Sequence, residues 1–235
     1  MSDTPTATEH PAPSASSARW MQGAWWATAL LGVATALTAL SARDAAAAWV
    51  ASGSRPDAVD WEELEVGASG AMSLLALATF AALVATIAWM WHTHRHLASV
   101  RSHPSRWGTG WTVIGWFIPV VNFVIPKVLL QESERVALDA AGGPRRTLSW
   151  VGHVFWVGWV VGSIGIGVAT VVWDGTVDLA ALESIDRSAV LDAYTWRIVG
   201  GFGLGVAGAA GALHLRRLHR LVVAAGGAAP DDEAA

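Results

Sequence analysis

The sequence predicts an all-α integral membrane protein, a helical bundle of four transmembrane helices with one proline-broken segment. The first observation is the composition: 53% of the 235 residues are hydrophobic and 14% are charged, whereas an ordinary soluble domain is about a quarter charged. The second is that four apolar stretches each reach the roughly 20 residues that a helix needs to cross a bilayer. The third is the presence of 15 tryptophans, a residue that concentrates where the bilayer meets water.

The composition also excludes several classes of protein. With no cysteine, the chain holds no disulfide framework, no cysteine-ligated metal and no thiol nucleophile. The net charge of -4 gives no electrostatic case for nucleic-acid binding. A soluble enzyme is disfavoured, because so few charged residues cannot cover a globule of this size.

The predicted elements follow in chain order. Residues 1–18 are rich in Ser, Thr, Pro and Ala and predict a disordered cytoplasmic tail. Residues 19–223 form the membrane domain, and residues 224–235 form a flexible C-terminal tail. The four predicted spans are residues 21–42, 71–91, 150–173 and 194–215.

A fifth apolar stretch, residues 107–126, contains Pro119 and Pro126. Proline removes a helix hydrogen bond and clashes with the preceding turn, so a straight spanning helix is not the default here. We predict a re-entrant or interfacial segment, with five transmembrane helices as the alternative. Residues 127–139 then regain helical character and predict an amphipathic helix along the cytoplasmic interface.

The distribution of basic residues favours the re-entrant or interfacial interpretation. If residues 107–126 return to the side on which they start, eleven Lys and Arg residues face the cytoplasm and four face outside. If the stretch crosses, six face the cytoplasm and nine face outside. The positive-inside rule favours the first arrangement, which places both termini in the cytoplasm. The eleven are Arg19, Arg95, Arg101, Arg106, Lys127, Arg135, Arg145, Arg146, Arg216, Arg217 and Arg220.

The broken segment is the most specific motif of the chain. It runs from Trp116 to Lys127 as WFIPVVNFVIPK, with Asn122 between the two prolines. The prolines free backbone groups that protein or a water-lined cavity must satisfy at membrane depth. Transporters build binding sites at such breaks, whereas the plainer interpretation is a structural plug in which the Asn122 amide caps its own turn.

Small residues in the last two predicted spans indicate close helix packing. Gly201-xxx-Gly205 lets two backbones approach, and Gly158-xxx-Gly162 is its predicted partner. His153 lies about one turn inside the third span, where an ionisable residue is a functional hypothesis by default. At this shallow depth, a neutral imidazole that reaches interfacial water is the plainer interpretation.

A histidine cluster follows the second predicted span. His92 and His96 are four residues apart on a helix, with His94 and His103 nearby. No neighbouring Asp, Glu or Cys completes a metal site. We therefore predict a juxtamembrane flank, whose arginines attract anionic headgroups.

Three parts of the sequence resemble the actinobacterial domain-of-unknown-function 4328 family: the aromatic exit Trp89–His96, the core Trp111–Lys127 and the QESERV helix after it. Members are multi-pass membrane proteins with a W-x-x-P-x-x-N-x-x-x-P segment, matched here by Trp116, Pro119, Asn122 and Pro126. The resemblance covers about residues 21–221, and His96 departs from it by standing where an Asn is expected. It implies a multi-pass membrane architecture and assigns no activity, ligand or catalytic residue.

We therefore expect a multi-pass protein of the cytoplasmic membrane with no enzymatic activity, cofactor or metal. Its expected role is structural or regulatory, through helix packing and contact with a partner or lipid. The alternative is a small channel or transporter with a site at Pro119–Pro126. The expected partners are the bilayer, with anionic headgroups at the basic cytoplasmic loops, and a second copy or another membrane protein, but not nucleic acid.

Overall fold

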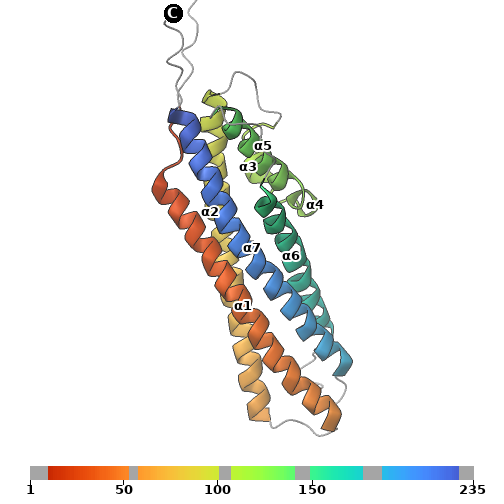
Figure 1. Ribbon diagram of the computed structural model, residues 1–235. Coiled ribbons are helices and arrows are strands. Elements are labelled where there is room, and N and C mark those ends of the chain that lie inside the picture. The colour runs from red at the N-terminus through yellow and green to blue at the C-terminus, as the bar shows by residue number, and fades with distance from the viewer. Residues whose placement is uncertain (1–9, 53–57, 101–106, 141–148, 177–186, 228–235) are drawn as a thin grey trace, which may run out of the picture. The chain divides into compact units, whose positions relative to one another are not determined.

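The computed structural model describes residues 10–52, 58–100, 107–140, 149–176 and 187–227, and the regular structure in these ranges is helical (Figure 1). The helices are α1 (Ala15–Ser52), α2 (Ala58–Val100), α3 (Trp111–Ile114), α4 (Pro119–Asn122), α5 (Ile125–Ala140), α6 (Trp150–Thr176) and α7 (Arg187–Gly227). Four of them, α1, α2, α6 and α7, are long and apolar enough to span a membrane. The predicted fold class is confirmed. The fifth apolar stretch forms only α3 and α4, of four residues each.

The long helices extend beyond the predicted spans. Helix α1 starts at Ala15, inside the predicted N-terminal tail, and α7 runs to Gly227, inside the predicted C-terminal tail. Ser14 explains the early start, because its Oγ accepts a hydrogen bond from the amide of Ser17 at 3.2 Å, as an N-cap residue does. Residues 1–9 and 228–235 of the two predicted tails lie outside the described residues.

The chain divides into two compact units. Unit 1 comprises residues 1–22, 83–150 and 213–235, and unit 2 comprises residues 23–82 and 151–212. Helices α3, α4 and α5 belong wholly to unit 1, as do the start of α1, the last part of α2 and the last part of α7. The segment that follows α2 therefore stays in one unit until α6 begins at Trp150.

In unit 2, the glycines of α7 bring its backbone against that of α1. A Cβ added to Gly32 of α1 would lie 2.5 Å from the amide nitrogen of Gly205. A Cβ at Gly201 would lie 2.9 Å from the amide nitrogen of Ala36. Because the obstructing atoms belong to backbone, no rotamer change makes room for a larger side chain. Glycine is required at this crossing to let the two helices approach.

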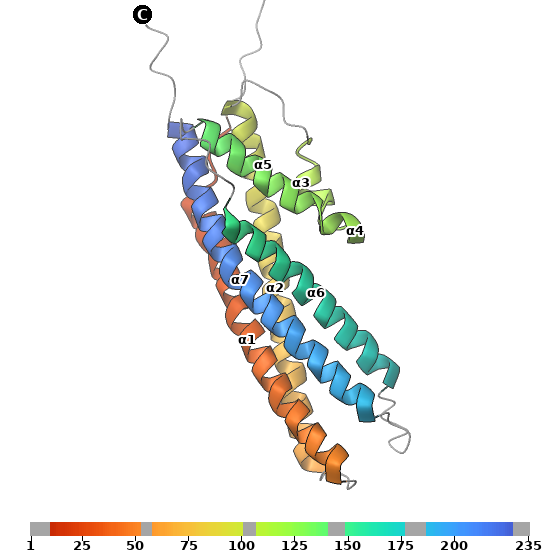
Figure 2. The ribbon, with the colours of Figure 1, turned by 45° about the vertical axis from the view of Figure 1, so that its right-hand side comes forward.

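A different set of α7 glycines faces α6, which lies on the other side of α7 in unit 2 (Figure 2). A Cβ at Gly203 would lie 2.7 Å from the amide nitrogen of Gly162, and a Cβ at Gly158 would lie 2.8 Å from that of Ala207. The structure therefore pairs Gly158 and Gly162 with a face of α7 other than that of Gly201 and Gly205. The prediction that Gly158 and Gly162 are the partners of Gly201 and Gly205 was therefore wrong. Helix α7 carries glycines on two faces, and its neighbour on the face of Gly201 and Gly205 is α1.

An aromatic layer completes the packing of unit 2. The ring of Trp25 meets Phe155 edge-on with centroids 5.0 Å apart and meets Trp159 at 6.2 Å. Gly211 of α7 leaves room for this layer, because its added Cβ would lie 3.0 Å from the Phe155 ring. Large aromatic rings therefore fill the space beside the close glycine contacts of these helices.

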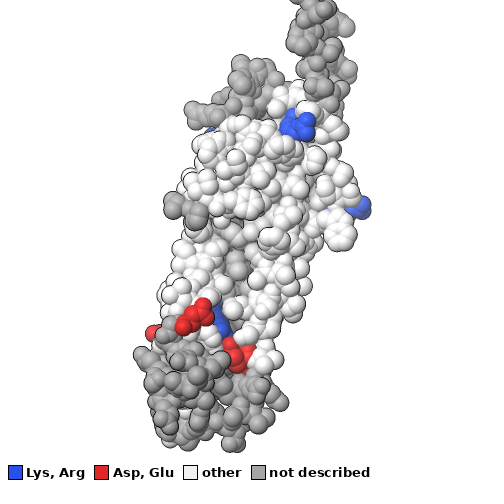
Figure 3. Space-filling view, turned by 180° about the vertical axis from the view of Figure 1, so that it is seen from behind, with Lys and Arg blue, Asp and Glu red and all other residues white. Residues whose placement is uncertain are grey.

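Large apolar side chains also cover the outside of unit 2. Leu74, Leu77 and Phe80 of α2 are exposed, as are Val161 and Ile164 of α6. Most of the described surface on the face shown in Figure 3 carries neither Lys or Arg nor Asp or Glu. A surface of this kind suits lipid, since monomeric soluble proteins rarely expose large contiguous apolar patches.

The close contact between α1 and α7 predicts opposite effects on stability for two glycine-to-alanine substitutions. Gly32→Ala places a methyl group into the backbone of α7, so we expect the free energy of unfolding in detergent to fall by about 1–3 kcal/mol. Gly167→Ala in α6 is the matched control, because nothing lies within 4 Å of its added Cβ, and we expect a gain of up to about 1 kcal/mol from the better helix propensity of alanine. Thermal unfolding of both variants in one detergent measures this, and equal losses would contradict the crossing.

Candidate functional site

The proline-broken segment in unit 1 keeps its backbone paired through short local bonds. The amide of Trp116 donates to the carbonyl of Val113 at 3.2 Å, and the amide of Asn122 donates to that of Ile118 at 2.7 Å. Both α3 and α4 pack against α5, and Gly115 permits the approach, because its added Cβ would lie 2.9 Å from the Ile125 side chain. The break is thus a folded turn.

The predicted motif residues occupy different positions in this turn. Trp116 and Pro126 are buried, whereas Asn122 and Lys127 are partly exposed. Pro119 begins α4. The Asn122 Oδ1 atom is buried without a hydrogen-bond partner among the described residues. The Asn122 oxygen therefore caps no backbone amide of the described residues.

Helix α5 is held in place by a buried carboxylate that sequence reasoning did not single out. The Glu134 Oε1 atom lies 2.9 Å from Nη1 of Arg217 on α7, and the Glu134 side chain is only 2% exposed. The same oxygen accepts a hydrogen bond from the amide of Ser149 at 3.3 Å, just before α6. Glu134 therefore ties α5 to α7 and to the residue that precedes α6.

The sequence contained a signal for this residue. Leu130, Glu134 and Ala137 are four and three residues apart, which places them on one helical face, and all three are buried. A glutamate on the apolar face of an amphipathic helix is the anomaly that predicts a buried ion pair. Its partner is not visible in the sequence, because Arg217 is one of several arginines in α7.

A second cluster of paired charges lies in unit 2. Glu65 of α2 accepts a hydrogen bond from the Tyr194 hydroxyl at 2.5 Å, and it forms an ion pair with Nη1 of Arg197 at 3.1 Å. The Ser69 hydroxyl donates to the same carboxylate at 2.7 Å. Arg197 also lies over the Trp173 ring, 4.4 Å from its centroid. The cluster therefore joins α2, α6 and α7.

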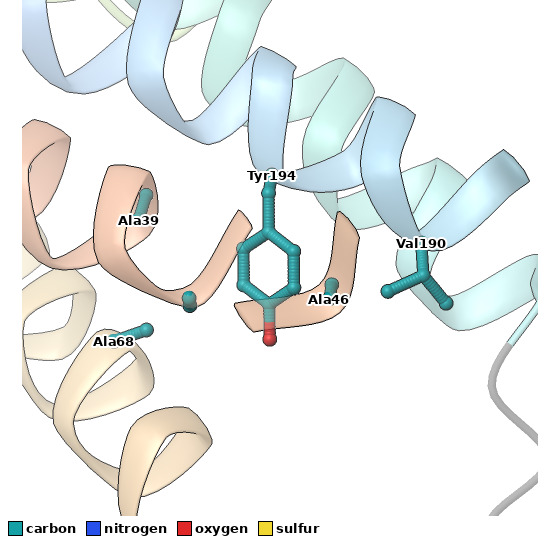
Figure 4. Packing of buried hydrophobic residues seen from close by; sticks show 6 residues of the cluster. Ala39, Ala46, Ala68, Val190 and Tyr194 are labelled. Atoms are coloured by element: carbon teal, nitrogen blue, oxygen red, sulfur yellow. The ribbon is translucent and has the colours of Figure 1, made fainter. Parts of the chain in front are cut away.

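Small residues make room for the tyrosine of this cluster. Figure 4 shows the Tyr194 ring on α7 among Ala39, Ala46, Ala68 and Val190. Alanines at these positions of α1 and α2 leave space for the ring, and its hydroxyl reaches Glu65. Because each polar atom of Glu65 and the hydroxyl of Tyr194 has a partner, the arrangement is that of a structural clamp.

The described histidines of the predicted sites differ in burial and contacts. His153 is exposed on α6. His92 is exposed whereas His96 is buried, so the two do not share a surface. The Nδ1 of His96 lies 2.7 Å from the His10 carbonyl, to which it donates, and Nδ1 of His94 lies 3.2 Å from the Thr109 hydroxyl. His103 lies outside the described residues.

Packing and ion pairing are the interactions that the described residues show most clearly. Among them, no group of three or more His, Asp or Glu side chains is placed to hold a metal ion. Two carboxylates of the described residues, the partly buried Glu65 and the buried Glu134, are each paired with an arginine. These ion pairs join α2 and α5 to α7 within their respective units.

The fold defines a class, that of helical proteins with four helices long and apolar enough to span a membrane and a proline-broken segment between the second and third of them. The chain belongs to the family described as domain of unknown function (DUF4328), whose model matches residues 52–220. The matched region includes the broken segment and α5 to α7 up to Arg220. No curated protein and no solved structure matches the chain.

The Glu134–Arg217 ion pair predicts that substitutions of its two residues lower the stability by unequal amounts. Arg217→Met leaves a carboxylate buried without its cation, so we expect the free energy of unfolding to fall by about 3–5 kcal/mol. Glu134→Gln costs less, because the Arg217 side chain is 39% exposed and water can solvate it. Arg216→Met, at an exposed position, is the matched control and should change stability by less than about 0.5 kcal/mol.

Unfolding of the three variants by titration with sodium dodecyl sulfate, in a single mixed-micelle system, measures these differences. The interaction energy follows from the double variant, whose loss should be smaller than the sum of the single losses. Additive losses, or a larger effect of Glu134→Gln, would show that the pair does not hold α5.

Proposed function

We propose that this protein is a non-enzymatic membrane protein whose role is structural or regulatory, and that it acts by presenting helix α5 to a partner at the membrane surface. The observation that carries the proposal is the fixed position of α5. A buried carboxylate, Glu134, attaches the inner face of α5 to α7. A helix anchored in this way offers its other face in a constant orientation.

The outer face of α5 is suited to such a contact. Arg135 and Asp139 are exposed there, four residues apart, while Leu129 and Leu130 point into unit 1. The inner face is therefore apolar and packed, and the outer face is charged. A partner of complementary charge would meet a rigid surface, and only its own side chains would lose conformational freedom.

The charges of the two units support a cytoplasmic position for α5. In the described part of unit 1, basic residues exceed acidic ones, whereas acidic residues exceed basic ones in unit 2. The basic residues in the described part of unit 1 are Arg19, Arg95, Lys127, Arg135, Arg216, Arg217 and Arg220. Its acidic residues there are Glu132, Glu134 and Asp139. We place the protein in the cytoplasmic membrane. Under the positive-inside rule, the basic unit 1 and both termini then face the cytoplasm.

The pairing of Glu65 and Glu134 with arginines supports a role without catalysis. A catalytic carboxylate needs access to substrate and a proton to give or take. Glu65 and Glu134 instead hold arginines of α7 at 3.1 Å and 2.9 Å. On this account the protein needs no cofactor or metal.

A channel or transporter is the second candidate, favoured by one observation. The Asn122 Oδ1 atom in the broken segment is buried and has no hydrogen-bond partner among the described residues. A buried acceptor left unpaired costs about 1–3 kcal/mol, and a solute with a donor group would relieve that penalty. The site would then lie between Pro119 and Pro126.

Isolation of the full-length protein from native membranes in lipid nanodiscs tests the proposal. We expect Arg135→Glu to lose a membrane-protein partner that the wild type retains, with no change in thermal stability, because the substitution reverses charge only on the exposed face of α5. Asp192→Arg, exposed on α7 in unit 2, is the matched control and should keep the partner. An identical set of bound proteins in all three samples would contradict the role assigned to α5.

Reconstituted vesicles separate the second candidate from the first. If Asn122 belongs to a transport site, vesicles containing the protein show a solute flux that Asn122→Ala abolishes. On the structural proposal, a panel of ions and small polar solutes shows no flux above that of protein-free vesicles.

A further inference from the structure

The broken segment carries apolar side chains that remain exposed although the segment packs against α5. Ile114, Phe117, Ile118 and Val124 fall within eleven residues of one another and are exposed. Phe117 is 72% exposed and Val124 is 54% exposed. We call these four residues the α3–α4 edge. Clustered exposed apolar side chains of this size mark a contact surface.

The edge cannot turn inward, because the inner side of the same turn is already filled. Thr112 and Trp116 of the same segment are buried, and Pro126 is buried at the start of α5. The Ile125 side chain closes the space beside Gly115. The amide of Phe117 is fixed to the carbonyl of Ile114 at 3.0 Å. The apolar side chains therefore remain on the surface of unit 1, where Figure 2 shows α4 at the outer edge of that unit.

Tryptophans of the same unit indicate what covers the edge. Trp20 near the start of α1 is 79% exposed, and Trp150 at the start of α6 is 72% exposed. Trp107 and Trp111 form an edge-on pair with centroids 5.5 Å apart, directly before and at the start of α3. Exposed tryptophan at the end of a spanning helix marks the boundary between hydrocarbon and headgroups. Unit 1 thus contains both that boundary and the α3–α4 edge.

We infer that the α3–α4 edge inserts into the headgroup and upper acyl layer of the bilayer, with Lys127 placed to meet anionic phospholipid headgroups. Lys127 follows Val124 by three residues, one turn along the start of α5. The interfacial layer also suits the backbone of this segment, because α3 and α4 have only four residues each and interfacial water can satisfy groups that hydrocarbon cannot. This lipid contact involves a different surface from the outer face of α5 and stands independently of that proposal.

The absence of cysteine in the chain allows a direct test by site-directed spin labelling. The full-length protein carries a single nitroxide at Phe117→Cys and is reconstituted in vesicles of phosphatidylcholine with phosphatidylglycerol. We expect the ratio of oxygen to nickel-chelate accessibility to approach that of a label at the lipid-facing Leu77→Cys. A label at Arg135→Cys, exposed on α5, is the aqueous reference and should give a clearly lower ratio.

Lys127→Glu tests the headgroup contact. In vesicles with phosphatidylglycerol it should move the Phe117 label toward water, whereas in phosphatidylcholine alone the two proteins should give the same depth. A Phe117 label as accessible to the nickel chelate as the Arg135 label would overturn the inference. Dipolar broadening that disappears on dilution with unlabelled protein would also overturn it, because a second copy would then cover the edge.

A labelled variant that unfolds is recognised by its thermal transition. In that case Ile114→Cys, at a second exposed position of the edge, carries the label. Whether Arg135→Glu loses the partner does not affect these accessibility ratios. The proposed role of α5 and the proposed lipid contact of the α3–α4 edge are therefore tested separately.

Discussion

Within lipid, every backbone amide and carbonyl must find a partner inside the protein, and this requirement governs the whole chain. The four long helices meet it through their own hydrogen bonds. Pro119 and Pro126 prevent a fifth helix from doing the same, because neither has an amide hydrogen to donate. The segment between residues 107 and 126 therefore folds as short local turns, which lie in unit 1 with the start of α1 and the end of α7. This need for backbone partners supports the proposed place of the segment at the membrane boundary.

Helix α7 is the element against which the others are positioned. It meets α1 and α6 in unit 2 through two faces of glycines. It also supplies the cation of two ion pairs among the described residues, one with the partly buried Glu65 of α2 in unit 2 and one with the buried Glu134 of α5 in unit 1. A buried ion pair adds little net stability, since desolvation offsets most of the attraction, but breaking one half is costly. The pairs therefore select which helices meet, while the glycines set how closely.

The sequence predicts the parts of this structure that depend on local properties. Apolar length located the four spans, and the two prolines located the break. The helix ends were missed because caps such as Ser14 lie in polar sequence that resembles a tail. Glu65 was missed as a site residue because its partner Arg197 is 132 positions away. A single sequence does not reveal pairings at that distance, nor which face of a glycine-rich helix meets which neighbour.

The central claim is that the chain crosses the membrane four times and that residues 107–126 return to the side from which they start. Labelling of single cysteines with a membrane-impermeant maleimide tests it, since no native cysteine interferes. Arg95→Cys before the segment and Arg220→Cys on α7 are both exposed positions in unit 1, and Asp192→Cys is exposed in unit 2. The account predicts labelling of Asp192→Cys in intact cells, and of the other two only after permeabilisation. Labelling of Arg220→Cys but not Arg95→Cys in intact cells would contradict it.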